Sequence, residues 1–174
     1  MGALVVFESM FGCTQSIAEA VGDGLTAAHI PAEVVEVGRA AGHDVAVARA
    51  DLLVIGAPTH MRGMSTPRTR ALARTRSDDL VSTDLGVHEW LDALPGLSGR
   101  LVAVFDTRSG ARFAGSAGER IERLLRKRNA RLVAPVQAFG VISKDDGTAE
   151  LGPGQLELAK AWGATLAGAL ASAI

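Results

Sequence analysis

The sequence predicts a single α/β domain, spanning residues 1–174, built on a parallel, doubly wound β-sheet. Two observations carry this prediction. Short runs of continuously apolar residues recur along the chain, and segments with helical spacing of apolar residues separate them. A chain of 174 residues is long enough for one domain with a substantial core and too short for two comfortable ones.

The strand candidates differ in pattern. Three runs contain no alternation with polar residues, at 4–7, 52–55 and 101–105. Continuous apolar runs of this length are typical of strands buried on both faces of a parallel sheet. Two weaker runs join them: residues 33–37 alternate in part, and residues 132–142 contain Pro135, which predicts an edge strand.

Helical segments are expected between the runs. Apolar residues recur at helical spacing over 17–28, 121–125 and 159–170. The long connection 57–99 contains Ser65-Thr66-Pro67, which is typical of a helix start, and residues 87–94 predict a second short helix.

Composition excludes several classes of function. The formal net charge of −1 provides no global field for a nucleic acid or an anionic membrane. One cysteine excludes a disulfide framework and a multi-cysteine zinc site, and His29, His43 and His88 lack metal-ligand spacing, so no metal is expected. There is no phosphate-binding Walker loop, no zinc-protease helix and no nucleophile triad.

Since the amino terminus has no basic leader, we expect a cytoplasmic protein without membrane insertion.

The loop after the first run carries the strongest chemical signal. In a doubly wound sheet, ligands bind beyond the carboxyl ends of the strands. Here Gly12 permits a tight turn before a helix start, whose free N–H groups attract anions, and Ser9 and Thr14 add hydroxyl donors. The residues therefore predict either an uncharged anion cradle or a plain turn with capping hydroxyls.

These residues also carry a family resemblance. Ser9-x-x-Gly12-x-Thr14 resembles the phosphate loop of flavodoxins, usually Thr/Ser-x-Thr-Gly-x-Thr. The segments 58–63 and 106–110 are similar to the two loops that flank the flavin, and Gly152-Pro153-Gly154 is similar to the beginning of the last flavodoxin helix. The resemblance covers nearly the whole chain in the right order.

The resemblance implies a flavodoxin-like sheet of five parallel strands in the order 2-1-3-4-5, with FMN as cofactor. The phosphate would lie on residues 9–14, and the isoalloxazine between the other two loops, held mainly by backbone groups. The implied cofactor-binding residues are Ser9, Met10, Phe11, Gly12, Cys13, Thr14, Pro58, Thr59, His60, Met61, Arg62, Gly63, Asp106, Thr107, Arg108, Ser109 and Gly110.

Three functions remain open at this point. The first is an FMN-binding protein that carries electrons to or from a redox partner protein. The second is an NAD(P)H-dependent quinone reductase, because Ser9-Met10-Phe11-Gly12 is similar to the Ser-Met-Tyr-Gly loop of flavodoxin-like quinone reductases. The third is a binding or regulatory module that has lost FMN. Phe11 replaces a common hydroxyl, and the flanking loops offer His60, Met61 and Phe113 instead of the usual Trp or Tyr.

Several side chains allow two interpretations. Five arginines lie between residues 62 and 76, and they are either a solvated helix face or a positive rim that suits an acidic partner. Cys13 is either a small loop residue or a redox-sensitive thiol at a helix start. His60 is either an exposed loop residue or a side chain that stacks on the flavin or passes it a proton.

Overall fold

The computed structural model describes residues 1–42, 44–110 and 115–174. The strands are β1 (Ala3–Phe7), β2 (Ala32–Glu36), β3 (Leu52–Pro58), β4 (Leu101–Ser109), β5 (Arg131–Leu132), β6 (Gln137–Ser143) and β7 (Ala149–Leu151). The helices are α1 (Cys13–Ala27), α2 (Val37–Ala40), α3 (Asp44–Arg49), α4 (Pro67–Arg74), α5 (Val87–Ala93), α6 (Ala117–Lys127) and α7 (Gln155–Ala173).

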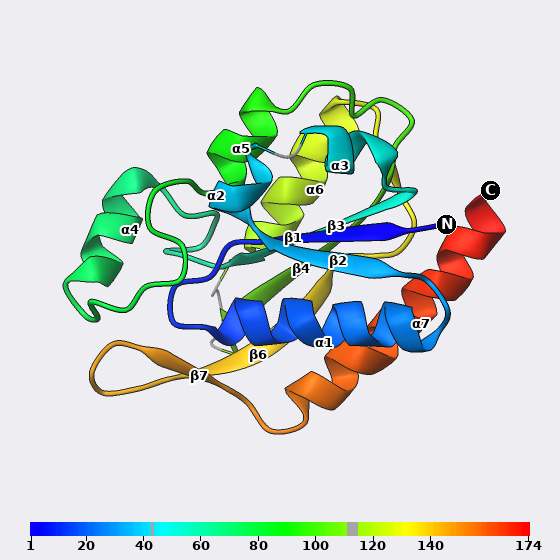
Figure 1. Ribbon diagram of the computed structural model, residues 1–174. Helices are drawn as coiled ribbons and strands as arrows, with labels where there is room; N and C mark the ends of the chain where they lie inside the picture. The colour runs from blue at the N-terminus through cyan, green and yellow to red at the C-terminus, as the bar shows by residue number, and fades with distance from the viewer. Residues whose placement is uncertain (43, 111–114) are drawn as a thin grey trace.

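The sheet has the strand order β2-β1-β3-β4-β6-β7, and β5 pairs with the beginning of β4 (Figure 1). Every pair is parallel except β6 with β7. The strand from the fifth apolar run is β6, so the predicted order 2-1-3-4-5 is confirmed, although the sheet has seven strands rather than five.

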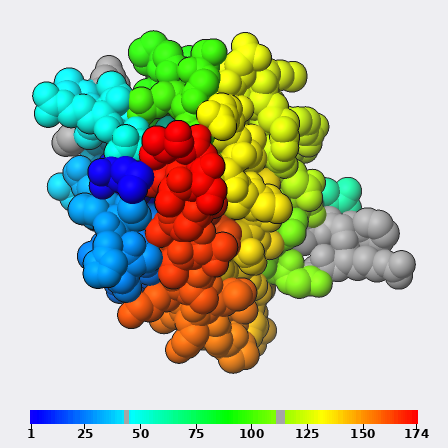
Figure 2. All heavy atoms as spheres, turned by 90° about the vertical axis from the view of Figure 1, so that its right-hand side faces the viewer, coloured from blue at the N-terminus to red at the C-terminus, as the bar shows by residue number. Residues whose placement is uncertain are grey.

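Helices cover both faces of the sheet. Side chains alternate along β1, so that Val5 and Phe7 pack under α1 and α7, whereas Leu4 and Val6 pack under α2, α5 and α6. Figure 1 shows α1 and α7 on one side of the sheet and α5 and α6 on the other, and Figure 2 shows α7 on the surface with both termini beside it. Burial on both faces explains why the central strands are continuously apolar in sequence.

Two glycines set how closely α1 and α7 approach. A Cβ added at Gly24 would collide with the carbonyl of Lys160, and one added at Gly163 would collide with the carbonyl of Val21. The two helix backbones therefore lie in direct contact in the carboxyl-terminal half of α1, which holds this helix firmly against α7.

The long connection follows the sequence prediction closely. Thr66 caps α4 by accepting the Thr69 N–H, and Pro67 occupies the first helical position, where its missing N–H costs nothing. The second predicted helix is α5.

The fifth run differs from the prediction. Pro135 lies between β5 and β6 and divides the run, and β6 is not an edge strand because β7 pairs with its outer side. The short antiparallel strand β7, together with α2 and α3, has too few residues for a periodic signal. Within the described ranges, no helix combines the length and apolar character needed to cross a bilayer.

Candidate functional site

A cavity of about 310 Å³ opens at the carboxyl ends of β1, β3 and β4. This volume lies within the range of small-molecule pockets. The predicted residues that line it are Ser9, Met10, Phe11, Cys13, Thr14, Pro58, Thr59, His60, Met61, Thr107, Arg108 and Ser109. The fold thus brings together all three loops singled out in the sequence.

Five predicted residues do not line the cavity: Gly12, Arg62, Gly63, Asp106 and Gly110. Two further walls were missed by sequence reasoning. One is α4 and its end, with Thr69, Leu72, Ala73 and Arg76, and the other is the β6–β7 hairpin, with Val141, Ser143, Gly147, Thr148 and Ala149. Neither wall carries a motif, because each contributes through its position in the fold.

The loop at residues 9–14, here called the phosphate loop, forms an open cradle. Gly12 is the N-cap of α1 with a φ of 91°, a left-handed conformation that favours glycine, and no side chain caps the helix. The Gly12 N–H donates to the Ser9 hydroxyl over 3.2 Å. A Cβ added at Gly12 would meet nothing within 4 Å, so the space in front of the helix start is empty. An uncapped helix start beside an open space suits an anion.

Buried hydrogen bonds hold this loop from behind. The hydroxyl of Ser82 accepts the Ser9 N–H over 3.1 Å and donates to Oε1 of Glu36 over 2.6 Å. The backbone adds two bonds, from Ser82 N–H to the Ser9 carbonyl and from Val81 N–H to the Met10 carbonyl. Ser82 and Glu36 are therefore supporting residues that sequence reasoning missed, because they come from segments remote in the chain.

Hydroxyl groups continue along the cavity wall. Oγ1 of Thr14 and Oγ1 of Thr107 lie 2.8 Å apart, and both residues are buried. This bond joins the phosphate loop to β4. It shows that the first and third predicted loops form one continuous polar surface.

Asp106 is a structural support for the site. Its Oδ2 accepts the Ser116 hydroxyl over 2.6 Å, the Gly118 N–H over 3.0 Å and the Thr59 hydroxyl over 3.3 Å. The carboxylate is fully buried and fixes the beginning of α6 against the loop after β3. It positions the loops and does not face the cavity.

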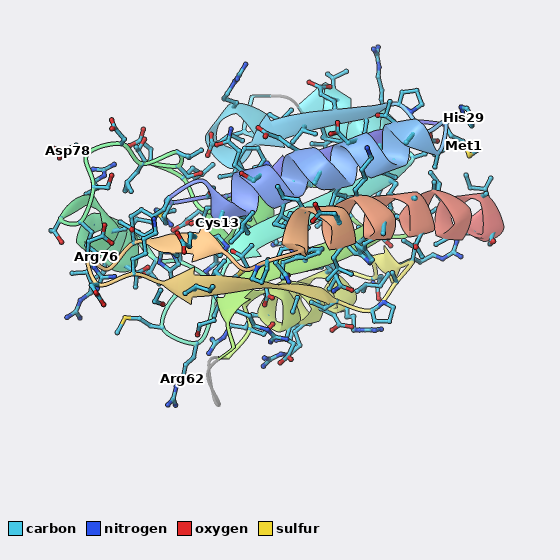
Figure 3. All side chains as sticks on the ribbon, turned by 90° about the horizontal axis from the view of Figure 1, so that it is seen from below. Met1, Cys13, His29, Arg62, Arg76 and Asp78 are labelled. Atoms are coloured by element: carbon cyan, nitrogen blue, oxygen red, sulfur yellow. The ribbon has the colours of Figure 1, made fainter. Side chains whose placement is uncertain are left out.

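The turn at residues 60–63, here called the 60s turn, closes on itself. His60 N–H donates to the Gly63 carbonyl and Gly63 N–H donates to the His60 carbonyl. Met61 and Arg62 have φ values of 44° and 74°, a region that non-glycine residues rarely occupy. The Met61 side chain is 82% exposed, and Arg62 is exposed and points away from the body of the protein (Figure 3).

His60 is uncharged at neutral pH. Burial in the cavity wall lowers its pKa to about 4, and the positive charges of Arg70 and Arg76 act in the same direction. The imidazole can therefore pack against an apolar ring or exchange a neutral hydrogen bond.

Arg70 departs from the solvated helix face that its neighbours suggest. It is only 3% exposed and donates to the Ser65 hydroxyl over 2.8 Å and to Oε1 of Glu89 over 3.0 Å. Bonding to Arg70 lowers the pKa of Glu89 although partial burial opposes it. Glu8 is fully buried nearby and accepts the Val87 N–H through Oε2, and burial raises the pKa of its carboxyl group.

The hairpin wall is joined to the rest of the cavity by two contacts. Nη1 of Arg76 donates to the Gly147 carbonyl over 3.1 Å, and Sγ of Cys13 donates to the Ala149 carbonyl over 3.4 Å. Figure 3 shows Cys13 at the beginning of α1 and Arg76 at the end of the hairpin. Burial raises the pKa of the Cys13 thiol, which favours the packing interpretation over a reactive thiolate.

Both tryptophans lie away from the cavity. Trp90, a residue of α5, is buried in the core between this helix and the sheet, and Trp162 packs edge-on against Phe105 and Phe139. Phe11 and His60 are the described cavity residues with flat rings, whereas Phe113 lies outside the described residues. Among the residues that the structure describes, no group of three His, Cys, Asp or Glu side chains could hold a metal ion.

The sequence of this chain matches a known protein family. The family model described as Flavodoxin matches residues 5–151. The chain belongs to the flavodoxin family. No curated protein is similar enough in sequence to count as a relative.

Solved structures share the fold at low sequence identity. A flavodoxin from the domain Archaea is 18% identical with a TM-score of 0.67, and the alignment covers 98% of this chain and 99% of the archaeal one. Flavodoxin 2 from Bacillus cereus is 22% identical with a TM-score of 0.66 over the full length of both chains. A WrbA-like flavodoxin from Agrobacterium tumefaciens is 19% identical with a TM-score of 0.63, over 99% of each chain. These similarities show the fold, whereas the family follows from the match over residues 5–151.

Proposed function

We propose that this flavodoxin-family protein binds FMN in the cavity and carries electrons. The observation that supports this most directly is the phosphate loop. It combines an uncapped helix start, an open space in front of Gly12 and two buried hydroxyls, at the edge of a cavity formed by the other two loops. An anion can bind there without a charged side chain.

The residues present fit the cofactor. The N–H groups at the beginning of α1 and the hydroxyls of Ser9 and Thr14 would hold the phosphate. The walls from Pro58 to Met61 and from Thr107 to Ser109 would hold the ring system. When bound, FMN supplies reversible one- and two-electron chemistry, while the protein orients it and tunes its potential. Neutral His60 and the exposed Met61 side chain would border the ring without adding charge.

One observation favours a second function, the reduction of quinones by NAD(P)H. The described part of the cavity wall contains neither Trp nor Tyr, because both tryptophans are in the cores and the chain has no tyrosine. A ring face flanked by His60 and Met61 would leave room for a second flat molecule. Steady NADPH oxidation with a benzoquinone would support this function, and its absence in an FMN-loaded sample would leave the electron carrier.

The central experiment compares FMN with riboflavin, which lacks the phosphate. We expect FMN to bind much more tightly, measured by flavin fluorescence quenching. In Thr14→Val, which loses the bond to Thr107, FMN affinity should fall about tenfold while riboflavin affinity changes little. Thr165→Val makes the same substitution at an exposed hydroxyl on α7, away from the cavity, and should leave both affinities unchanged.

Equal affinities for FMN and riboflavin would contradict the phosphate loop. If neither flavin binds, the proposed function is wrong, and the alternative of a binding or regulatory module that has lost FMN is the one left to test.

A further inference from the structure

Arginine side chains gather on one side of the cavity mouth. Arg62 lies in the 60s turn, which bridges to Gly115 at the approach to α6. A Cβ added at Gly63 would come within 2.6 Å of Nε of Arg120, so the Arg120 side chain lies across this turn. Arg123 follows one helical turn later on α6, and Arg108 lines the cavity itself. We call Arg62, Arg108, Arg120 and Arg123 the arginine surface.

The nearby carboxylates compensate Arg108 but leave the other three arginines uncompensated. Glu122 pairs with Arg126 over 2.7 Å, and Arg108 lies 3.7 Å from Oδ1 of Asp106 and 4.0 Å from Oε1 of Glu119. Within the described ranges, Arg62, Arg120 and Arg123 have no carboxylate oxygen within 4.0 Å. Residues 111–114, which lie outside the description, contribute no acidic side chain in sequence. The three guanidinium groups are exposed, so their charge is available to a partner.

Exposed apolar side chains line the cavity whose mouth these arginines border. Met61 is 82% exposed and Leu72 is 48% exposed, and both line the cavity. An apolar centre with a charged rim is the usual anatomy of a protein interface. Methionine also adapts its shape to different partners.

The opposite end of the mouth carries an excess of acidic side chains, because Arg74 and Lys144 there are already paired with Asp84 and Glu150. Asp78 and Asp79 follow α4, and Asp145 and Asp146 lie in the turn of the hairpin, beside the Arg76–Gly147 contact. Figure 3 shows Arg62 and Asp78 at opposite ends of this side of the molecule, with Arg76 between them. The charge is therefore polarised across the mouth although the whole chain carries only −1.

We propose that the arginine surface, with Met61 at its edge, is the docking site for an acidic protein that exchanges electrons with the bound cofactor. Opposite charges steer such partners together and fix their orientation. The polarised mouth would turn the acidic face of the partner towards α6 and away from the hairpin. The electron-transfer part rests on the proposed function, whereas the binding of an acidic surface does not.

The first arm of the test needs no flavin. An octaglutamate peptide serves as the acidic probe, and amide shifts in NMR spectra report where it binds. We expect shifts in the 60s turn and the first turns of α6. The triple variant Arg62→Gln/Arg120→Gln/Arg123→Gln should weaken binding at least about threefold. A matched triple, Arg49→Gln/Lys127→Gln/Arg131→Gln, removes three exposed positive charges elsewhere and should not.

The second arm uses the FMN-loaded protein. After anaerobic reduction, two equivalents of ferricyanide, an anion, take the two electrons and are reduced to ferrocyanide, while the anionic reduced flavin returns to its oxidised form and releases one proton to solvent. Stopped-flow rates should fall as salt is raised, and hexaammineruthenium(III), a cation, should show the opposite trend. The arginine triple should lose most of this salt dependence, and the matched triple should retain it.

Each arm can overturn the proposal. Equal peptide affinity in both triple variants, or faster reaction with the cation at low salt, would show that the surface does not select acidic partners. Tighter binding of a single-stranded oligonucleotide than of octaglutamate would assign the surface to nucleic acid instead. A protein that binds the peptide as expected but no FMN would refute the proposed function and retain the docking site.

Discussion

The phosphate loop and the 60s turn border the same cavity, but they hold their shapes by different means. The loop is fixed by buried, uncharged bonds to other segments, through Ser82, Thr107 and the backbone at Val81. The 60s turn is closed by two bonds of its own, and it carries exposed side chains on left-handed backbone. The first is a rigid neutral cradle, whereas the second is a local, solvated turn beside positive charge.

This difference indicates a division of labour. A phosphate needs donors held in place before it arrives, because ordering them on binding would cost affinity. A redox ring needs surroundings that set its electrostatics and leave an edge open to partners. Changes in the loop should therefore weaken binding, and changes near the turn should adjust what a bound cofactor does.

The largest effect is expected from Gly12→Val. A β-branched residue is strained at a φ of 91°, by about 1–2 kcal/mol, and its side chain would enter the open space of the cradle. We expect FMN affinity to fall at least about 100-fold, which corresponds to about 2.7 kcal/mol. Isothermal titration measures this directly.

The control for this variant is Gly96→Val. Gly96 also has a left-handed backbone, with a φ of 70°, and a Cβ there also meets nothing within 4 Å. It should cost similar stability without affecting FMN affinity. Equal losses of affinity in the two variants would show that strain alone, and not the cradle, explains the result.

The second prediction concerns His60, on which the positive charges of Arg70 and Arg76 act. Its pKa of about 4 lies below the ordinary value of 6.5, so the unfolded chain binds the proton more readily. Native stability should therefore be lost as the pH falls from 6.5 towards 4, by about 2 kcal/mol between pH 7.5 and pH 5. Urea unfolding at the two pH values measures this.

In His60→Gln this part of the pH dependence should disappear, whereas His88→Gln, on the exposed face of α5, should retain it. Neutralising a nearby charge sharpens the comparison further. In Arg76→Gln the pKa of His60, followed by NMR, should rise because one of the repelling charges is gone. An unchanged pKa would mean that Arg76 has no influence and that burial and the charge of Arg70 keep the imidazole neutral.

The loop and the turn also differ in how far sequence predicts them. The apolar runs predict the central strands because burial on both faces leaves a clear pattern, and Thr66-Pro67 predicts the start of α4 because capping is local. The phosphate loop is visible for the same reason: its glycine, hydroxyls and helix start are adjacent in sequence.

What sequence could not predict depends on contacts between remote segments. Ser82 and Glu36 support the phosphate loop from elsewhere in the chain. Arg70 is buried because Ser65 and Glu89 accept hydrogen bonds from its guanidinium group. The positive rim expected from the five arginines between residues 62 and 76 changes accordingly. Glu89 compensates the charge of Arg70, and the side chain of Arg62 points outwards. Among the described residues, the arginines that line the cavity are Arg76 and Arg108.

The smallest effect, and the one most specific to this cavity, compares Arg76 with Arg62. Fully reduced FMN is anionic, so a cation in the cavity wall favours reduction. Charges ~8 Å apart at an effective dielectric of ~20 interact by roughly 2 kcal/mol. Since Arg76 is exposed, solvent and salt screen most of this. A remainder of about 0.5 kcal/mol would shift a two-electron potential by about 10 mV.

Arg76→Gln should therefore make the potential of bound FMN more negative by about this amount, measured against a reference dye at low ionic strength. Arg62→Gln should shift it less, because that side chain points away from the cavity, and added salt should reduce both shifts. A larger shift from Arg62→Gln would mean that the ring lies towards the tip of the 60s turn and that the walls formed by α4 and the hairpin do not enclose it.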